Sequence, residues 1–537
     1  MAERRRKFWG WGWEDEGPTA DQQQRIAQLL AARFALAAVT QAPPPRIEEI
    51  ELRAPRVAAP AALASICSTL PFDRVAHTYG KSFSDVVRAF RRAYPNPPDI
   101  VAFPRDEDDI VALLDWCTDA GVAAIPYGGG SSVVGGVQPP DGDSYSGALS
   151  IDLRQLDRVL DVDRHSRAAR IQAGTYGPAL EQQLRPFNYT LRHFPQSFEF
   201  STLGGWIATR SGGHFATLYT HIDDFVESLR VVTPSGLVES RRLPGSGAGP
   251  SPDRLFIGSE GILGIITEAW MRVQDRPRFR NAVSVTFDSF MAGVAAARAV
   301  SQAGLYPANC RLLDAGEALT SGAGSGNESV LIVAFESADH ALDAWMARAL
   351  ECCRDHGGHV PAGAGTTRTD DDAARGGAAG AWRQSFLNAP YLRDVLVGMG
   401  MITETFETAV TWDRFAEFHA DVTAAAESAV RDVCGAGQVT CRFTHLYPDG
   451  PAPYYSVIAP AKPGSQLEQW REIKAAASDA VLRLGGTITH HHAVGRDHRP
   501  WYDRQRPDGF ARALGAAKHA LDPMGILNPG VLLDPQH

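Results

Sequence analysis

Several features that identify common protein classes are missing from this sequence. Only seven of its 537 residues are cysteines and no CxxC pair occurs, so neither a disulfide framework nor a zinc site is predicted. No window contains about 18 consecutive apolar residues, which argues against a membrane-spanning helix. The formal net charge of -10 excludes non-specific binding to nucleic acid, because such binding depends on clustered lysine and arginine.

A secretion signal is not expected either. The chain begins with a basic run, Arg4–Lys7, but Phe8–Trp13 leads directly into acidic residues and no apolar core follows. Cysteines that are odd in number and form no framework fit a reducing compartment. We therefore expect a cytoplasmic protein.

What is present describes a globular protein with more than one domain. Hydrophobic residues make up 44% and charged residues 21% of a chain that exceeds one ordinary domain. Short apolar runs between turns predict an α+β fold. We expect an N-terminal helical segment over residues 1–95, a first domain over 96–275, a second (cap) domain with an antiparallel sheet and helices over 276–486, and a C-terminal segment with a closing helix over 487–537.

Periodicity and turn residues predict individual elements within these parts. Helices are expected at Gln22–Ala37, Ser82–Arg92 and Gly509–Leu521. Strands are expected at Ile100–Phe103, Gly121–Pro126, Ala148–Asp152, Ala168–Ala173, Leu229–Thr233, Gly264–Val273, Ser284–Phe287 and Val330–Phe335. Two stretches of low complexity, Leu243–Pro252 and Thr367–Gly380, are expected to be mobile loops.

A glycine run, Pro126–Ser132, is typical of a loop that holds a diphosphate, because residues without Cβ let backbone N–H groups close around an anion. Three further segments follow it in order, Gln196–Thr202, Thr209–Gly212 and Glu260–Ile266. The fingerprint GxGxxG after a first strand is absent, which disfavours a nicotinamide-binding domain. The candidate cofactor-binding residues are Pro126, Tyr127, Gly128, Gly129, Gly130, Ser131, Ser132, Gln196, Ser197, Phe198, Glu199, Phe200, Ser201, Thr202, Thr209, Arg210, Ser211, Gly212, Glu260, Gly261, Ile262, Leu263, Gly264, Ile265 and Ile266.

These segments resemble those with which flavoenzymes of the vanillyl-alcohol oxidase type wrap FAD. The resemblance implies a two-part FAD-binding domain over residues 96–275, with FAD as the cofactor. Some relatives attach FAD covalently through a histidine, and Arg210–His214 is similar to that turn. The glycine run Pro126–Ser132 itself contains no histidine, so we expect FAD to be bound non-covalently.

Further motifs resemble one branch of these flavoenzymes, the alkyldihydroxyacetonephosphate synthases, over nearly the whole chain. They are Trp9–Gly12, Pro195–Trp206, Arg311–Asp314, Tyr391–Asp394, Glu404–Thr408, Trp412–Arg414, Thr440–Arg442, Tyr454 and His490–His492. The resemblance implies a transferase that exchanges the acyl group of acyl-dihydroxyacetone phosphate for a long-chain alcohol. This step of ether-lipid formation would pass through an adduct at flavin N5.

The resemblance also assigns roles to individual residues. Tyr454 corresponds to an acid/base tyrosine, and the adjacent His490, His491 and His492 correspond to an essential histidine cluster. Arg311 corresponds to an arginine that the active site requires, and Arg393 to a substrate-binding arginine, whose planar fork suits a phosphate. The implied partner is a phosphorylated, lipid-like small molecule. We expect peripheral membrane contact for access to this lipid, and a homodimer.

Two other functions remain open. FAD-dependent oxidases and dehydrogenases of a D-2-hydroxy acid or a related alcohol share the fold, but they carry a His-rich metal site and a Glu-His-Gly element. This chain has Thr444–Gly450 and His491–Ala493 at the matching places, so the metal set is incomplete and no metal ion is expected. The third interpretation is a flavin-binding scaffold without catalysis.

The candidate residues also have structural interpretations. Arg311 could form an ion pair with Asp314, and Tyr454 could be part of a sheet core, because aromatic residues favour strands. Imidazoles with pKa values near neutrality can exchange protons with a substrate. If the three histidines lie on a strand, however, neighbours point to opposite faces and at most two of them reach one site.

Overall fold

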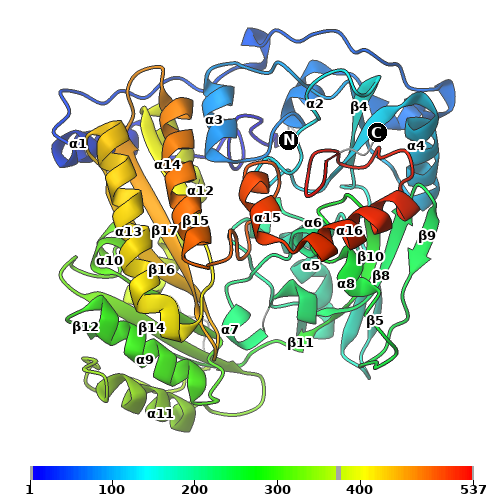
Figure 1. Ribbon diagram of the computed structural model, residues 1–537. Coiled ribbons are helices and arrows are strands. Elements are labelled where there is room, and N and C mark those ends of the chain that lie inside the picture. The colour runs from blue at the N-terminus through cyan, green and yellow to red at the C-terminus, as the bar shows by residue number, and fades with distance from the viewer. Residues whose placement is uncertain (1–3, 220, 370–376, 535–537) are drawn as a thin grey trace.

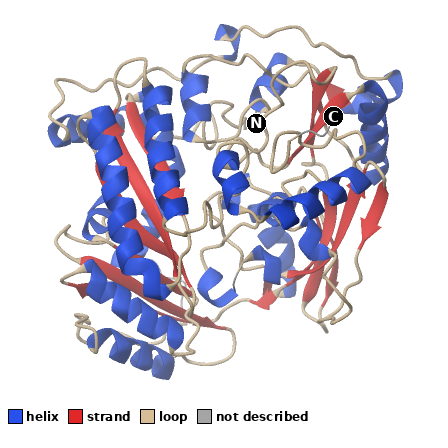
Figure 2. Cartoon of the chain, in the orientation of Figure 1, coloured by secondary structure: helices blue, strands red, loops and turns tan. Residues whose placement is uncertain are grey.

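The computed structural model describes residues 4–219, 221–369 and 377–534 and has two halves (Figure 1). One half contains a large sheet covered by helices. The other contains a four-stranded, a five-stranded and a two-stranded sheet (β7, Tyr189–Thr190, with β11, Gln274–Asp275), and the last part of the chain crosses it. Helices and strands occur in both halves (Figure 2), so the predicted α+β class is confirmed. In the described part of the chain, no helix is long and apolar enough to cross a membrane.

The N-terminal helices begin where polar side chains cap them. α1 (Ala20–Arg33) follows Thr19, and α3 (Phe83–Phe90) follows Ser82, whose hydroxyl accepts a hydrogen bond from the Asp85 N–H (3.0 Å). Both predicted helices are confirmed, although they end earlier than expected. The short elements between them are η1 (Ile47–Glu49), η2 (Ala61–Ile66), β1 (Cys67–Ser68) and α2 (Pro71–Ala76).

The glycine run follows one strand of a small sheet, whose strand order is β1-β2-β4-β3. Three of its strands are parallel: β2 (Ile100–Ala102), β4 (Gly147–Asp152) and β3 (Val122–Tyr127). Helix α4 (Glu107–Ala120) provides the crossover that parallel strands require, and Gly121 ends it with a φ of 62°. Because β3 ends at Tyr127, the glycine run lies at the carboxyl end of a buried strand.

A second, antiparallel sheet has the order β5-β6-β10-β8-β9. Its strands are β5 (Val159–Asp163), β6 (Ala168–Gln172), β10 (Ile265–Arg272), β8 (Val226–Thr233) and β9 (Gly236–Glu239). The elements around it are α5 (Gly177–Leu184), η3 (Arg185–Phe187), β7 (Tyr189–Thr190), η4 (Phe198–Phe200), α6 (Leu203–Thr209), α7 (Ala216–Tyr219), η5 (Ile222–Asp224), α8 (Asp253–Phe256) and β11 (Gln274–Asp275). Buried side chains of both small sheets form one continuous core.

The other half is built on a six-stranded antiparallel sheet with the order β12-β14-β13-β16-β17-β15. Its strands are β12 (Phe279–Phe287), β13 (Asn309–Leu313), β14 (Ser329–Ser337), β15 (Met401–Glu407), β16 (Gln438–Leu446) and β17 (Pro451–Pro460). Its helices are α9 (Phe290–Gln302), α10 (Ala315–Ser321), α11 (Asp343–Arg354), α12 (Gly377–Gly398), α13 (Trp412–Cys434) and α14 (Gln466–Arg483).

Strand alternation divides this sheet into two different faces. Leu312 and Tyr455 are buried in the core formed with α9, α11, α13 and α14. Their neighbours Arg311 and Tyr454 point to the opposite face, where α10 and α12 contribute a smaller apolar cluster around Trp382. This second face is therefore the one on which the sequence places candidate catalytic residues.

The last part of the chain returns to the glycine run. After α15 (Arg499–Gln505) and α16 (Asp508–Leu521), residues 526–528 run beside β3, and Ala124 exchanges backbone hydrogen bonds with Ile526 and Asn528. The Asn528 side chain donates to the carbonyls of Gly136 (3.0 Å) and Glu260 (2.7 Å). The C-terminal segment thus ties the glycine run to the fourth candidate cofactor segment.

One predicted loop is partly wrong. Leu243–Pro252 has no helix or strand, as expected, but α12 already begins at Gly377, inside the predicted loop Thr367–Gly380. Residues 370–376 of that loop lie outside the described residues. The helix forms despite its glycine- and alanine-rich start because Trp382 is buried against the sheet.

Candidate active site

The glycine run packs directly against the second candidate segment. A Cβ added to Gly128 would overlap the Thr202 hydroxyl, and one added to Gly129 would overlap the carbonyl of Phe200. Only glycine permits this close approach of two backbones. A cavity of about 520 Å³ opens beside them and is lined by Tyr127, Gly129, Ser131 and Phe200, among others. A glycine cradle next to a cavity is the arrangement expected for the diphosphate of a nucleotide cofactor.

The other two candidate segments lie elsewhere, and in the described structure neither lines this cavity. In Thr209–Gly212, a Cβ on Gly212 would be 2.9 Å from the His445 ring. In Glu260–Ile266, Ile262, Leu263 and Ile265 are core residues. The Glu260 carboxylate accepts hydrogen bonds from the N–H groups of Val494 (2.9 Å) and Gly495 (2.8 Å), and burial raises its pKa to about 7.

The three adjacent histidines form a tight turn rather than a strand, which overturns the expectation that at most two could face one site. Their backbone N–H groups converge on one carboxylate, that of Glu407 at the end of β15, with distances of 2.6 Å (His490), 3.1 Å (His491) and 2.9 Å (His492). The Thr489 hydroxyl donates to the same carboxylate (2.6 Å). Burial alone would raise the pKa of Glu407, but the histidines and Thr489 lower it well below its usual range.

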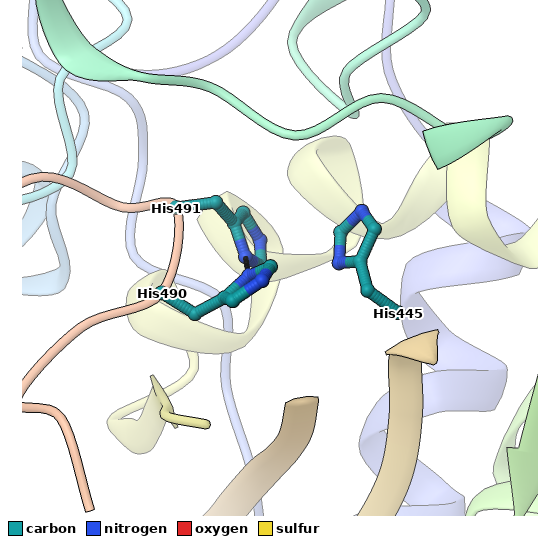
Figure 3. A group of neighbouring side chains, drawn as sticks. All are labelled: His445, His490 and His491. Carbon is teal, nitrogen blue, oxygen red and sulfur yellow. Dashed lines mark hydrogen bonds between the residues drawn. The ribbon is translucent and has the colours of Figure 1, made fainter. Parts of the chain in front are cut away.

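His490 and His491 point from this turn towards His445 on β16 (Figure 3). One nitrogen from each of the three lies within 4.8 Å of the others, a spacing that could hold a metal ion. A hydrogen bond joins His490 Nδ1 to His491 Nδ1 (3.0 Å), and His445 Nε2 donates a hydrogen bond to the Gly213 carbonyl (3.2 Å). The described carboxylates contribute no ligand to this group of three.

A tyrosine and a fourth histidine extend the cluster. The Tyr447 hydroxyl lies 2.7 Å from Nε2 of both His221 and His490, and these two nitrogens are 3.1 Å apart. Burial lowers the pKa of His221, His490 and His445, and it lowers the pKa of His491 to about 3. These imidazoles are therefore neutral at pH 7, when each can accept one proton while donating another.

Tyr454 lies beside the histidine turn and between two strands. It pairs with Glu407 on β15 and with Arg442 on β16, whose guanidinium is 3.9 Å from the centre of its ring. Ring centres of His491 and His492 are 6.2 and 5.4 Å away. Burial raises the pKa of Tyr454, and Arg442 opposes that shift. The structure thus brings Tyr454 and the histidines together.

Arg311 is a buried cation with unsatisfied donors. Its Nε and Nη1 atoms have no hydrogen-bond partner among the described residues, and Nη2 donates only to the carbonyl of His214 (3.4 Å). The expected alternative, an ion pair with Asp314, is not found within the described chain, because Asp314 caps α10 instead. Burial and the neighbouring Arg442 lower the pKa of Arg311 to about 9, so it remains charged at pH 7 and able to bind a carbonyl or anionic oxygen.

Arg393, on α12, approaches the same site from its other side. Its Nε is buried without a partner among the described residues, and Nη1 donates to the carbonyl of Lys81 (3.4 Å). Its charge acts on both Tyr454 and His492. All the candidate catalytic and substrate residues therefore surround one region between the two halves.

Several site residues have no role in the sequence-based assignment. Glu407 lies in the synthase-like motif Glu404–Thr408, and His445 lies in Thr444–Gly450, the segment that departs from the oxidase motif. Only the fold shows what these two residues contact. Tyr447 lies in the same segment as His445, whereas His221 carries no motif signal and is 269 residues from its partner His490. His214, the residue of the covalent-attachment alternative, stacks on Trp382 in the other half, 5.5 Å between ring centres.

Comparisons with known proteins agree with these features. Residues 98–240 match the family "FAD binding domain" and residues 276–532 match "FAD linked oxidases, C-terminal domain", so FAD is the cofactor. An alkyldihydroxyacetonephosphate synthase of Dictyostelium discoideum is 31% identical over 474 residues, which cover 86% of this chain and 77% of that protein. The Caenorhabditis elegans synthase is 30% identical, with 86% and 80% covered. A solved structure of an alkyldihydroxyacetonephosphate synthase matches with a TM-score of 0.80, 25% identity and 98% of both chains covered.

Proposed function

Because the chain belongs to the alkyldihydroxyacetonephosphate synthase family, we propose that it exchanges the acyl group of acyl-dihydroxyacetone phosphate for a long-chain alcohol. One observation carries the proposal furthest. Tyr454, the neutral histidine turn and the unsatisfied donors of Arg311 lie on one buried face, so a base and an oxygen-binding cation are available at one place.

Bound FAD would supply an electron sink beside these residues. Tyr454 would move the proton at the substrate carbon next to the ester, since its ring lies beside His491 and His492, which can pass a proton on. Arg442 favours the ionised phenol, because its guanidinium lies over the ring and its charge lowers the tyrosine pKa against the effect of burial. The histidine turn would accept and return the proton.

The two arginines with unsatisfied donors would bind different oxygen-containing groups of the substrate. Arg311 would polarise the ketone oxygen, because its free Nε and Nη1 atoms can donate two hydrogen bonds in a buried setting. Arg393 would bind the phosphate, because its buried Nε has no partner among the described residues and its charge acts on Tyr454. Replacing Arg393 by lysine keeps the charge but loses the fork, so the KM for the phosphorylated substrate should rise while the FAD content stays constant.

Adjacent tyrosines offer a matched test of the catalytic assignment. Tyr454→Phe should lower kcat by about 10²-fold or more, the usual scale for a lost general acid or base. Tyr455→Phe is the control, because Tyr455 is fully buried on the other face, where its hydroxyl lies 3.1 Å from His419 Nδ1 and also interacts with Cys441 and Thr423. Full activity in Tyr454→Phe with FAD bound would refute the role of this phenol.

An anaerobic spectrum separates the exchange reaction from hydroxy-acid oxidation. The exchange produces no net reduction, so acyl-dihydroxyacetone phosphate with alcohol should turn over while the flavin remains oxidised at the end. Oxidation of a D-2-hydroxy acid would bleach the flavin with that substrate alone. Bleaching by a hydroxy acid, together with no acyl exchange, would replace the proposed function by the oxidoreductase alternative.

A further inference from the structure

The N-terminal arm, residues 4–13, is an ordered loop that lies between the two halves of the molecule (Figure 1). It folds back on itself, because the Lys7 N–H donates to the Gly12 carbonyl (3.0 Å) and Arg6 forms an isolated antiparallel bridge with Trp13. Its tight turn requires glycine at position 12, which has a φ of 87° and no room for a Cβ beside the Tyr391 ring.

Both halves hold this arm. In the six-stranded half, the Asp394 carboxylate of α12 accepts a hydrogen bond from the Trp11 N–H (2.6 Å), and a Cβ on Gly10 would overlap the same carboxylate. In the other half, the Lys81 ammonium donates to the carbonyls of Lys7 and Phe8 (3.3 Å each). The Lys81 N–H donates to the carbonyl of Ser132 (2.6 Å), so one residue links the arm to the glycine cradle.

The arm brings a concentration of positive charge to the cavity beside the cradle. Among the described residues, the cavity is lined by the four basic residues Arg4–Lys7, by Lys81 and by Arg154, against a single carboxylate, that of Asp73. Arg4 is neutralised by Asp15 (2.9 Å) and Arg154 by Asp152 (2.5 Å).

Arg5 and Arg6 both lack a described carboxylate partner, but Arg5 lies over Phe72, whereas Arg6 lies beside the candidate cofactor segments. The Arg6 guanidinium lies 4.1 Å from the centre of the Tyr176 ring and 5.5 Å from that of Phe200. Aromatic faces orient such a cation without neutralising it. Arg6 is therefore held in place with its charge still available to a ligand.

The candidate cofactor segments themselves cannot balance a diphosphate. Pro126–Ser132, Gln196–Thr202, Thr209–Gly212 and Glu260–Ile266 contain no lysine, and their one arginine, Arg210, is paired with Asp223 (2.8 Å). Backbone N–H groups of the cradle donate hydrogen bonds but carry no net charge. A cation from elsewhere in the chain would supply the charge that these segments lack.

We propose that Arg6 of the N-terminal arm binds the diphosphate of FAD and that the arm closes the cofactor site. A phosphate of the substrate has the same chemistry, but the cavity favours the cofactor: Tyr127, Gly129 and Ser131 of the cradle line it, whereas Arg393 does not. The proposal concerns cofactor binding alone and does not depend on which reaction the enzyme catalyses.

Flavin titrations of the apoprotein test the proposal without any substrate. FAD and riboflavin, which lacks both phosphates, are added separately and the quenching of flavin fluorescence gives each Kd. Arg6→Met keeps an apolar stem and removes the charge, so the Kd for FAD should rise about 10-fold or more, the scale of one lost charge-assisted contact. The Kd for riboflavin should not change. Arg6→Lys should give an intermediate Kd for FAD.

Arg25→Met is the matched control, because Arg25 is an exposed basic residue of the same N-terminal segment, on α1, and does not line the cavity. Both of its Kd values should equal those of the wild type. The proposal is overturned if Arg6→Met binds FAD within twofold of the wild type, or if it weakens FAD and riboflavin equally. It is also overturned if only the KM for the phosphorylated substrate rises. If Arg6→Met does not fold, an unchanged Kd for FAD in Arg6→Lys would overturn the proposal.

Discussion

Glu407→Gln should disorder the histidine turn without removing the flavin. One carboxylate oxygen of Glu407 accepts from His491 N–H, His492 N–H and the Thr489 hydroxyl, and the other accepts from His490 N–H. A glutamine can at best keep the first three, and its amide then places a donor against the His490 donor. The loss is about 1.5–3 kcal/mol for the broken bond and about 0.5–1 kcal/mol for each bond that is no longer charge-assisted, or roughly 4 kcal/mol in total.

Hydrogen exchange measures this loss at the turn itself. If the amides of His490, His491 and His492 exchange by local opening, 4 kcal/mol corresponds to roughly a 10³-fold loss of protection. Turnover should fall by about 10²-fold or more, because misplaced catalytic groups cost that much. Bound FAD should remain.

The matched control is Glu404→Gln on the same strand. Glu404 is also buried, but its carboxylate accepts from Trp470 Nε1 (2.6 Å) and Lys474 Nζ (3.3 Å) and not from the backbone N–H groups of the turn. This variant should lose stability and keep both the protection of the turn and the turnover of the folded enzyme. Less than a 10-fold change in protection and in turnover for Glu407→Gln would refute the reasoning.

Four further predictions follow from the cradle and the histidine cluster. Acid precipitation should release FAD into the supernatant, because the cradle Pro126–Ser132 contains no histidine; flavin that stays in the pellet would show a covalent bond. Burial keeps the pKa of His491 at about 3 and that of His492 at about 4. Titration of these two histidines should therefore cause no loss of kcat/KM around pH 6.5. A loss of kcat/KM below pH 6.5 that disappears in His491→Gln would contradict this. The unfolded histidines take up protons below pH 6.5 and the folded ones do not, so stability should fall as the pH falls from about 6.5 to 4, by about 1.4 kcal/mol per pH unit for each group, measured as Tm. Dialysis against a chelator should leave turnover unchanged if His445, His490 and His491 only exchange hydrogen bonds, whereas activity restored by a divalent ion would show that they hold a metal.

Local signals in the sequence predict the backbone elements and the cofactor family well. The cradle could be found because a glycine run after a strand has a steric meaning that does not depend on distant residues. Helix α12 could not, because Gly377, Gly380 and Pro390 have poor helix propensity and the burial of Trp382, Val395 and Leu396 stabilises the helix. Tertiary packing decides such a segment, and periodicity contains no information about it.

The histidine turn shows the same limit at the site. Adjacent histidines are compatible with a strand, and only the position of Glu407, more than 80 residues earlier in the chain, makes the backbone curl so that all three reach one region. The Tyr447 and His221 contacts likewise depend on how two sheets meet. The sequence alone therefore identifies the reactive residue types and leaves their partners open.

The pairing of β15 with β17 has a consequence for how such an enzyme can change. Glu407 and Tyr454 are direct partners across these strands. The carboxylate that supports the histidine turn and the phenol of Tyr454 are therefore fixed at the same register position of one strand pair. A one-residue slip of β17 would exchange Tyr454 for Tyr455 and turn the phenol into the core. An insertion in the loop between β16 and β17 that shifts the register of β17 would therefore separate base from support in one step. Evolution or redesign of the substrate range has to act through helices and loops around this strand pair, because the strand pair itself sets the distance between the reacting groups.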